Sequence, residues 1–500
     1  MIDQKIKLIT GSLLHDIGKV VYREGSDRRN HSVSGYDFLK EEGKIEDKEI
    51  LDCVRYHHFS EIKSARLKED NLAYIVYLAD NIAAFADRRK KEDTEEKGFD
   101  LSVPLQSVFN VLNGNNQSFY YQPGDMDDQG KINYPASEKK PFSREFYMKI
   151  CQRMLDNFRG MNWSEEYLNS LLAVMEANLS YMPSSTSNEE LSDISLFDHV
   201  KLTAAISSCI YDYLNENHLS YKTELFDKKD FYDRNAFLLC SMDISGIQSF
   251  IYTISSKNAL KNLRARSFYL EIMMEHIIDL LLDRLQLSRA NLLYSGGGHC
   301  YLLLANTTET VIQIQKFQEE LKEWLLKQFQ TDLFVAFGYV QCTGNAFRNV
   351  PEGSYTELFR KMSKMLSLQK QHRYTAREII RLNNRKEQDY SRECKVCKKI
   401  GHVDEEGVCP LCRKIEKLSK NVLYADFFSV VLENPDERED AMPLPGGYCL
   451  VADDEKKLCR RMENDDYFVR AYSKNKLYTG KHIATKLWVG DYSTGSTFEE

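Results

Sequence analysis

The sequence predicts a multidomain α+β protein, and three observations support this fold class. Apolar residues recur at helical spacing through most of the first 215 residues. The segment 236–341 then alternates short apolar runs, typical of strands, with longer amphipathic segments, typical of helices. Two Cys-x2-Cys pairs follow, which is the pattern of a small metal-bound ribbon. A chain of 500 residues has room for roughly three domains.

The composition excludes several classes of protein. With 42% hydrophobic and 28% charged residues, the chain has the make-up of an ordinary globular protein. Its net charge of −8 argues against a protein that coats nucleic acid, so any polyanion site must be a local basic surface. We expect no membrane contact, because the sequence has no run of about 18 apolar residues and MIDQKIKLIT is not a signal peptide. The 12 cysteines, four clustered and the rest scattered in apolar contexts, indicate a reducing, cytoplasmic location.

The first helical segment, GSLLHDIGKV, contains the adjacent residues His15 and Asp16. This pair, followed closely by Gly-Lys, resembles the signature of the HD superfamily of metal-dependent phosphohydrolases. Mixed imidazole and carboxylate ligation suits Mn, Fe, Ni or Co. Such a metal lowers the pKa of a bound water, and the resulting hydroxide attacks phosphorus. Further candidate ligands follow in chain order: His31, His57, His58 and Asp80.

The ligand candidates differ in how strongly the pattern favours them. The helix around Asp80 has its apolar residues on one face, so its carboxylate is expected to point inward, where an unpaired charge is costly. His31 alternatively begins a helix, and one of the two histidines that follow Tyr56 is expected to face away from the metal. Asp198 and His199 are either further ligands or an internal hydrogen-bonded pair, and we favour the pair.

Residues 98–143 interrupt the helical pattern. They form a polar stretch with Pro and Gly, which predicts a solvent-exposed insertion or loop. Helical periodicity resumes after residue 143. We therefore expect residues 1–215 to form one all-α domain that carries the metal site.

The segment 236–341 has the order β-α-β-β-α-β, which is that of the ferredoxin-like fold, and we assign residues 216–345 to this domain. Palm domains of polymerases and nucleotide cyclases place one Asp at the end of the first strand and more carboxylates on the hairpin, so that two ions clamp a triphosphate. Here Asp243 is present, but the hairpin reads Ser-Gly-Gly-Gly-His. A lone Asp cannot hold two ions, so we expect a palm that binds a nucleotide without catalysis. The predicted nucleotide-binding residues are Asp243, Ser245, Gly246, Gly296, Gly297, Gly298 and His299.

A simpler alternative for this region also exists. The glycines would then only form a tight turn, and Asp243 would cap the next helix.

Two groups of basic residues are candidate nucleic-acid contacts. Lys257, Lys261 and Arg264 fall on one helix face. Downstream, four arginines repeat every four residues and predict a cationic stripe that could follow a nucleic-acid backbone. The alternative is a solvated helix face paired with nearby glutamates. The four arginines are Arg373, Arg377, Arg381 and Arg385.

The most specific local signal is the pair of CxxC motifs in residues 394–412. Four thiolates at this spacing form a tetrahedral zinc site with no position left for water, so the zinc is expected to be structural. We place this ribbon in a helical linker, residues 346–434, followed by a strand-rich region, residues 435–500. The predicted ligands are Cys394, Cys397, Cys409 and Cys412.

In this order, an HD segment, a palm with a GGG hairpin and a four-Cys ribbon resemble the large subunit of type III CRISPR effector complexes, more closely the type III-A (Csm) form. The phrases LLHDIGK, LADNIA, DISGIQ, LRARS and YSGGGH carry this resemblance. It implies that the protein works with crRNA and the other Csm subunits. Pairing with target RNA would activate an HD nuclease for single-stranded DNA, and a pair of palms would convert ATP into cyclic oligoadenylate.

The resemblance carries over unevenly. It implies catalytic roles for five residues, a divalent ion (Mn, Ni, Co or Mg) at the HD site, and ATP with Mg as palm substrate. No Gly-Gly-Asp-Asp hairpin, the mark of the catalytic second palm, occurs in these 500 residues. Either that palm follows residue 500 or this member cannot cyclise ATP, and we favour the first. The alternatives are a non-enzymatic RNA-binding scaffold and a stand-alone HD nucleotide phosphohydrolase. The implied catalytic residues are His15, Asp16, His57, His58 and Asp80.

Overall fold

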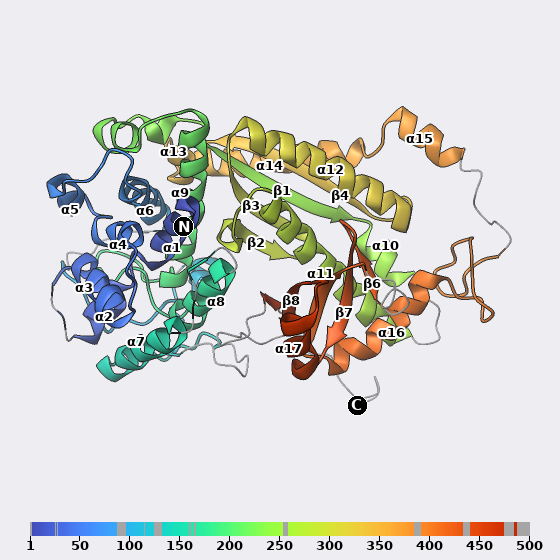
Figure 1. Cartoon of the computed structure of the whole chain (residues 1–500), viewed down its shortest axis with the longest axis horizontal. Coiled ribbons are helices and arrows are strands. Elements are labelled where there is room, and N and C mark those ends of the chain that lie inside the picture. Colours follow the sequence, from blue (N-terminus) through green and yellow to red (C-terminus); the bar gives the residue numbers. More distant parts are fainter. Residues whose placement is uncertain are drawn as a thin grey trace.

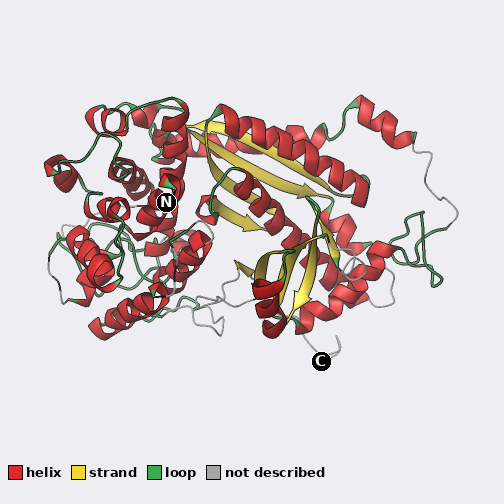
Figure 2. Cartoon of the chain, viewed as in Figure 1, coloured by secondary structure: helices red, strands yellow, loops and turns green. Residues whose placement is uncertain are grey.

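The computed structural model places a helical body at one end of an elongated molecule and two β-sheets with their helices at the other (Figures 1 and 2). The mixed α+β class predicted from the sequence is confirmed. The structure describes residues 3–25, 27, 29–87, 97–114, 116–124, 133–159, 161, 163–164, 167–253, 259–384, 392–433, 441–474 and 485–487.

The helical body is built around α1 and α9, which pack against each other and bury their apolar faces. Leu8 and Leu13 of α1 are fully buried, as are Val200 and Ile206 of α9. Polar residues at the N-caps start several of these helices, for example Asp47, whose carboxylate accepts from the first amides of α4. The helices are α1 (Gln4–Leu14), α2 (Gly18–Glu24), α3 (His31–Asp37), α4 (Lys48–Arg55), α5 (Phe59–Ser64), α6 (Ala73–Asp87), α7 (Arg144–Phe158), α8 (Leu168–Leu179) and α9 (Leu196–Glu216).

The first sheet has the strand order β2-β3-β1-β4, and each pair of neighbours is antiparallel. This is the topology of the predicted ferredoxin-like domain. Gly297 and Gly298 make the tight turn between β2 and β3 with φ of +61° and +79°, which glycine adopts without strain. The strands are β1 (Phe237–Ser245), β2 (Leu292–Gly296), β3 (His299–Ala305) and β4 (Phe334–Cys342).

Helices cover both faces of this sheet. Leu238 and Met242 point to one face, into a core shared with α11 (Ala259–Arg284) and α12 (Thr308–Phe329). Leu239 points to the other face, into a core that it shares with residues of α6, α9 and α14 (Ser354–Gln371). The first sheet is therefore packed directly against the helical body.

The second sheet has the order β6-β7-β5-β8-β9. Apolar residues of β5, such as Phe428 and Val430, share one core with α11 of the first domain. Strand β5 (Phe427–Leu432) lies at the centre of this sheet, although it precedes residue 435, where we had expected the strand-rich region to begin. It forms one sheet with the strands after that residue. The elements are α16 (Pro410–Tyr424), β5 (Phe427–Leu432), β6 (Met442–Leu444), β7 (Tyr448–Asp453), α17 (Glu455–Asn464), β8 (Phe468–Lys474) and β9 (Thr485–Leu487).

Shorter segments connect these elements. The long helix predicted after β1 begins as α10 (Ile247–Tyr252), which precedes α11. In the described part of the 98–143 insertion, the only helical segment is the 3-10 turn η2 (Val108–Asn113). The remaining ones are α13 (Gly344–Phe347), α15 (Ala376–Asn383), the π-turns Phe38–Glu42 and Thr223–Asp227, and the 3-10 turns Phe231–Asp233 and Arg289–Asn291.

The close approach of α2 and α3 positions the N-terminus of α3 and depends on glycine. A Cβ built on Gly18 would lie 1.8 Å from the carbonyl oxygen of His31 and 2.7 Å from the amide nitrogen of Gly35. The backbone of α3 has no freedom to yield without moving His31. Gly18 therefore lets the two helices touch.

We expect Gly18→Ala to destabilise the protein by about 1–3 kcal/mol, because the added methyl group overpacks a backbone contact. The measurement is thermal unfolding followed by circular dichroism. Gly401→Ala is the matched control, since a Cβ there meets nothing within 4 Å, and it should leave Tm unchanged. Equal Tm values for the two variants would contradict this account of the α2–α3 contact.

Candidate metal centre and palm site

His15 and Asp16 lie in the turn between α1 and α2, and both are almost fully buried. The Nδ1 atom of His15 is 2.7 Å from the carbonyl oxygen of Ser12. A carbonyl only accepts, so Nδ1 carries the proton, and the lone pair of Nε2 points into the site. The same device orients His57, whose Nδ1 is 2.7 Å from the carbonyl oxygen of Val54. Backbone carbonyls thus prepare both imidazoles as ligands.

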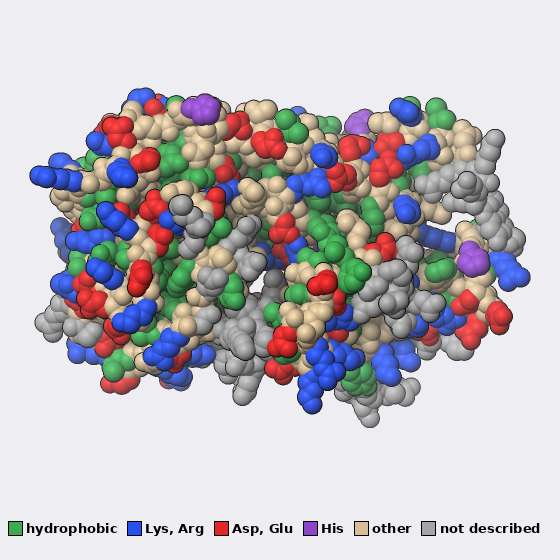
Figure 3. All heavy atoms as spheres, in the orientation of Figure 1, with side chains coloured by type: hydrophobic (Ala, Val, Ile, Leu, Met, Phe, Trp, Pro, Cys, Tyr) green, Lys and Arg blue, Asp and Glu red, His purple; other side chains and the backbone are tan. Residues whose placement is uncertain are grey.

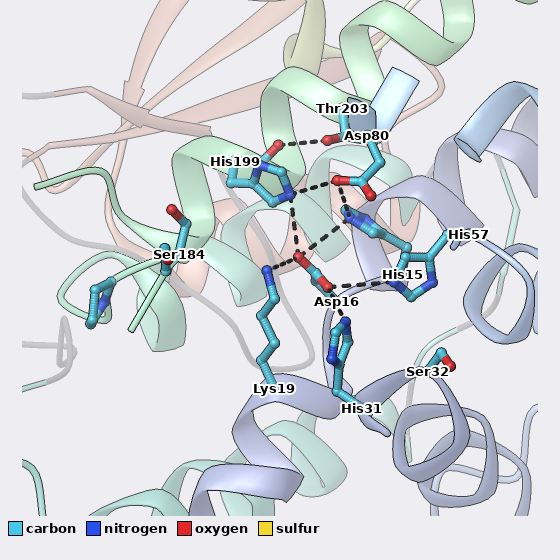
Figure 4. Close-up of polar contacts among 12 residues, drawn as sticks. His15, Asp16, Lys19, His31, Ser32, His57, Asp80, Ser184, His199 and Thr203 are labelled. Atoms are coloured by element: carbon cyan, nitrogen blue, oxygen red, sulfur yellow. Dashed lines mark hydrogen bonds and ion pairs between the residues drawn. The ribbon is translucent and has the colours of Figure 1, made fainter. Parts of the chain in front are cut away.

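Two groups of side chains converge on either side of Asp16 (Figure 4). Within each group, the candidate ligand atoms all lie within 4.8 Å of one another. The first group is His31, His57 and His58, and the second is His15, Asp80 and His199.

Asp16 bridges the two groups. Its Oδ1 is 3.3 Å from Nε2 of His31, in the first group. Its Oδ2 is 3.2 Å from Nε2 of His199 and 3.5 Å from Nε2 of His15, in the second. Lys19 lies three residues after Asp16, and its Nζ is 2.5 Å from the same Oδ2. One carboxylate therefore faces two candidate cation positions, which is the arrangement of a two-metal site.

The electrostatics of the site keep its donors in the forms that bind cations. Burial alone would raise the pKa of Asp16, but the Lys19 ammonium and the neighbouring imidazoles hold it well below its usual value. Burial and the adjacent His58 lower the pKa of His57 well below 6.5. Burial and His31 lower that of His58 to about 4. At neutral pH the carboxylate is thus ionised and these two imidazoles are neutral.

The residues fit a divalent metal. In the part of the chain that the structure describes, Nε2 of His15 and Nε2 of His57 are buried without a hydrogen-bond partner, although both face a cluster of acceptors and imidazoles. A buried polar atom without a partner is costly. A cation bound in each ligand group would satisfy one of these atoms.

All six HD residues chosen from the sequence come together, but two interpretations were wrong. His199 belongs to the ligand groups that we had not favoured for it, because its Nε2 lies 3.1 Å from Oδ1 of Asp80 and 3.2 Å from Oδ2 of Asp16. Asp198 accepts from Ser195 Oγ at 2.7 Å. The signal was available, since His199 lies on the apolar face of α9 with Leu196 and Val200 on either side in sequence.

The second correction concerns the paired histidines, neither of which faces away. The rings of His57 and His58 lie 4.0 Å apart, and Nε2 of His58 is 2.8 Å from Nε2 of His31.

The palm site contains a carboxylate, Asp243, that already has two side-chain partners. Asp243, at the end of β1, pairs in register with His299 of β3, whose Nδ1 is 3.1 Å from Oδ2. Lys370 of α14 places its Nζ 2.9 Å from Oδ1. Burial would raise the pKa of Asp243, but His299 and Lys370 hold it below its usual value. With its charge balanced in this way, Asp243 has little need of a divalent ion.

The alternative that Asp243 caps the next helix is wrong. The N-cap of α10 is Gly246, with φ of +95°, and it makes no side-chain cap. A Cβ at Gly246 would lie 1.8 Å from the carbonyl oxygen of Asp332, so glycine is required there.

The tip of the hairpin is open. At Gly297, a Cβ would meet nothing within 4 Å, so this part of the hairpin faces open space. Ser295, beside it, donates to Glu275 at 2.6 Å.

The four clustered cysteines form a compact site that can hold a metal ion. Their sulfur atoms lie within 4.8 Å of one another. The amide of Cys409 donates to Sγ of Cys394 at 3.3 Å, and Arg266 of α11 donates to Sγ of Cys412, also at 3.3 Å. Among the described residues, Val403 is the one non-cysteine residue buried in this cluster, so a metal is the natural centre of its fold.

The predicted basic surfaces do not form as expected. Arg264 is only 8% exposed and donates to Ser419, so it does not share an exposed face with Lys261, and Lys257 lies outside the described residues. On the face shown in Figure 3, basic and acidic side chains are interspersed.

The arginine stripe is also shorter than predicted. Helix α15 begins at Ala376, so Arg373 lies before it, and Arg385 lies outside the described residues. Arg377 and Arg381 are exposed on the helix, and Arg381 pairs with Glu323 at 2.7 Å. Residues 372–375, between α14 and α15, break the four-residue repeat.

Among the described helices, none is both long and apolar enough to cross a membrane.

Two family models match the chain, the HD domain over residues 1–84 and the Csm1 subunit domain B over residues 236–385. The chain is 41% identical over 505 residues to the "CRISPR system single-strand-specific deoxyribonuclease Cas10/Csm1 (subtype III-A)" of Enterococcus italicus, covering 98% of this chain and 66% of that protein. The protein of the same name from Mycobacterium tuberculosis is 40% identical, with 98% and 65% covered. The chain therefore spans just under two thirds of the length of these relatives.

Solved structures share the fold. A Csm1-Csm4 cassette in complex with pppApA matches with a TM-score of 0.70 at 23% identity, over 98% of this chain and 60% of that one. A cassette in complex with one ATP matches with a TM-score of 0.69 at 23% identity, with 98% and 60% covered.

We expect the metal-free protein to lose thermal stability as the pH falls from about 6.5 towards 4. The pKa of His58 is lowered from 6.5 to about 4 in the folded chain. Between these values the unfolded state binds more protons than the folded state, so stability decreases as pH decreases. His58→Gln should reduce the slope of this dependence without abolishing it, because the pKa of His57 is also lowered. The measurement is Tm against pH in the presence of a chelator.

The exposed His372 supplies the control for this experiment. His372→Gln should keep the wild-type slope. If His58→Gln kept it as well, the stated origin of the pH dependence would be wrong.

Proposed function

Because the chain belongs to the Cas10/Csm1 family of subtype III-A CRISPR systems, we propose that its HD site is the metal-dependent centre of a nuclease that cuts single-stranded DNA. The observation that carries the proposal is the position of Asp16, a buried carboxylate between two groups of inward-facing ligands. A scaffold without enzymatic activity would have no need of such a costly buried arrangement.

Seven residues would hold the ions: His15, Asp16, His31, His57, His58, Asp80 and His199. Divalent ions bound there, for which we propose Mn, Ni, Co or Mg, would supply an acidified water and positive charge for the phosphoryl oxygens. The backbone carbonyls of Ser12 and Val54 keep two of the imidazoles in the tautomer that binds a cation. Lys19 pairs with Asp16 at the edge of the site.

Two further roles follow from the family. We propose that the first palm binds ATP with Mg, as half of a pair that makes cyclic oligoadenylate, and that the four cysteines hold structural zinc. The paired Asp243 supports a binding role, because its charge is already balanced by His299 and Lys370.

The proposed partners are crRNA, target RNA and other Csm subunits. The free cysteines fit a cytoplasmic setting. A stand-alone HD nucleotide phosphohydrolase, which would need no RNA, is the alternative.

Asp16→Asn should lower metal-dependent cutting of a labelled single-stranded oligonucleotide by at least about 100-fold, since even residues that only orient metal ligands contribute 10–100-fold. Asparagine keeps the shape but loses the charge that faces both ligand groups. The matched control is Asp198→Asn, which removes the exposed carboxylate next to His199 and should cut at the wild-type rate. Wild-type cutting by folded Asp16→Asn protein would refute the proposed nuclease centre.

Gly297→Leu should weaken ATP binding by about 10-fold or more, equivalent to roughly 1.4 kcal/mol, because the side chain fills the open space above the hairpin. The measurement is titration calorimetry with ATP and Mg. Gly447→Leu is the control, since Gly447 also lies in a hairpin turn with positive φ (+83°) and open surroundings. Both variants carry the same backbone strain, so equal ATP affinity in the two would argue against the palm site.

A further inference from the structure

A cavity of about 480 Å³ opens beside the metal centre. Two of its lining residues, Lys19 and His31, also contact Asp16, so the cavity is continuous with the proposed nuclease site. In Figure 4, Lys19 reaches Asp16 between His31 on one side and Ser184 on the other, and Ser184 also lines the cavity. The volume falls in the range of small-molecule sites, roughly 300–1,000 Å³.

The outer wall of the cavity is a rigid pair of short segments. Phe99 and Ser187 form an antiparallel bridge. The amide of Asp100 donates to the carbonyl of Thr186 at 2.9 Å, and the amide of Asn188 donates to that of Gly98, also at 2.9 Å. The backbone of Phe99 is thus fixed, yet its ring is 76% exposed at the cavity rim. An exposed aromatic ring on a fixed backbone offers a face on which a planar group can stack.

The segment that pairs with Phe99 also carries hydroxyl groups. Residues 184–187, here called the hydroxyl loop, read Ser-Ser-Thr-Ser and line the cavity. The guanidinium of Arg23 donates to the carbonyls of Pro183 and Ser184 at 2.8 and 3.3 Å, which anchors the start of this loop. The Ser185 hydroxyl donates to Glu190 and accepts from the amide of Ser187. The hydroxyls of Ser184 and Thr186 can both donate and accept, so they suit the mixed hydrogen-bonding edge of a nucleobase.

The charges of the cavity favour a base over a phosphate. Arg29 lines it, but its guanidinium pairs with Asp27 at 2.6 Å and Asp37 at 2.9 Å. Lys19 pairs with Asp16. The carboxylate of Glu190 also lines the cavity and would repel a phosphate. The third cation of the lining, Arg23, is 5% exposed and donates to backbone carbonyls, so the lining offers mainly aromatic and polar groups.

We propose that this cavity is a base-binding subsite for the nucleotide next to the phosphodiester that is cut, with the base stacked on Phe99 and its edge on the hydroxyl loop. The inference rests on the proposed nuclease function and extends it to substrate selection. A base in a duplex would have to leave its stack and its partner to enter, at a cost of a few kcal/mol. A single strand pays no such unpairing cost, so the cavity selects single-stranded DNA.

The test is the kinetics of cutting by Phe99→Ala on a short labelled oligonucleotide. Loss of one stacked base should raise KM by about 10-fold or more, while Phe99→Tyr should restore the wild-type value. Phe109→Ala is the matched control, because Phe109 is also exposed, at 65%, but does not line the cavity, and its KM should be that of the wild type.

A second readout separates a stacking role from a structural one. In a series of oligonucleotides with a single abasic position, the wild type should show a raised KM at one position relative to the cut, and Phe99→Ala should not. An unchanged KM in Phe99→Ala, or a position effect that persists in it, would overturn the subsite and leave the nuclease standing. A wild-type chain that cuts no single-stranded DNA when divalent metal, crRNA, target RNA and the other Csm subunits are all present would overturn both.

Discussion

A buried carboxylate is stable only where cations or donors surround it, and the N-terminal body is organised around that requirement at Asp16. The residue is 1% exposed and is enclosed by side chains from α3, α9 and the loop after α4. These elements lie far apart in the sequence. The Asp16 carboxylate therefore connects distant parts of the helical body, in addition to its proposed role in binding ions. The Gly18 contact with α3 serves the same end, because it brings His31 within reach.

Asp243 meets the same requirement in a different way. Its neighbours are one lysine and one histidine, which balance its charge without metal. Asp16 also has one lysine partner, Lys19, but imidazole nitrogens of His15, His31 and His199 lie within 3.5 Å of its oxygens and belong to two groups of candidate metal ligands. The two carboxylates therefore lie in different surroundings, one between two groups of candidate ligands and one beside a single lysine and a single histidine. The difference lies in the partners and not in the acids.

The two sites are connected through packed elements. Helix α9 carries His199 in its first turn, and further along it buries Cys209 against Leu303 of the first sheet. A buried ionic network adds a second link, in which Arg289 pairs with Glu275 and Asp279 of α11. Glu275 accepts from Ser295 of the glycine hairpin, Asp279 from Tyr472 of the second sheet, and the Arg289 amide donates to Asn169 of α8. These contacts join the glycine hairpin, the second sheet and the helical body through one buried network.

Local patterns in the sequence determined much of this protein. Strand and helix periods predicted the ferredoxin-like order, and a run of three glycines predicted the hairpin. The spacing of the cysteines predicted their site, and the apolar helix face predicted the inward direction of Asp80. Tertiary structure decided what spacing cannot show. The direction of His199, the convergence of His57 and His58, the burial of Arg264 and the cavity between residues 99 and 184 all depend on which distant elements pack together. The physical reason is that long-range packing decides which residues a side chain contacts. A local sequence pattern shows only the conformation of its own segment and which face of that segment is apolar.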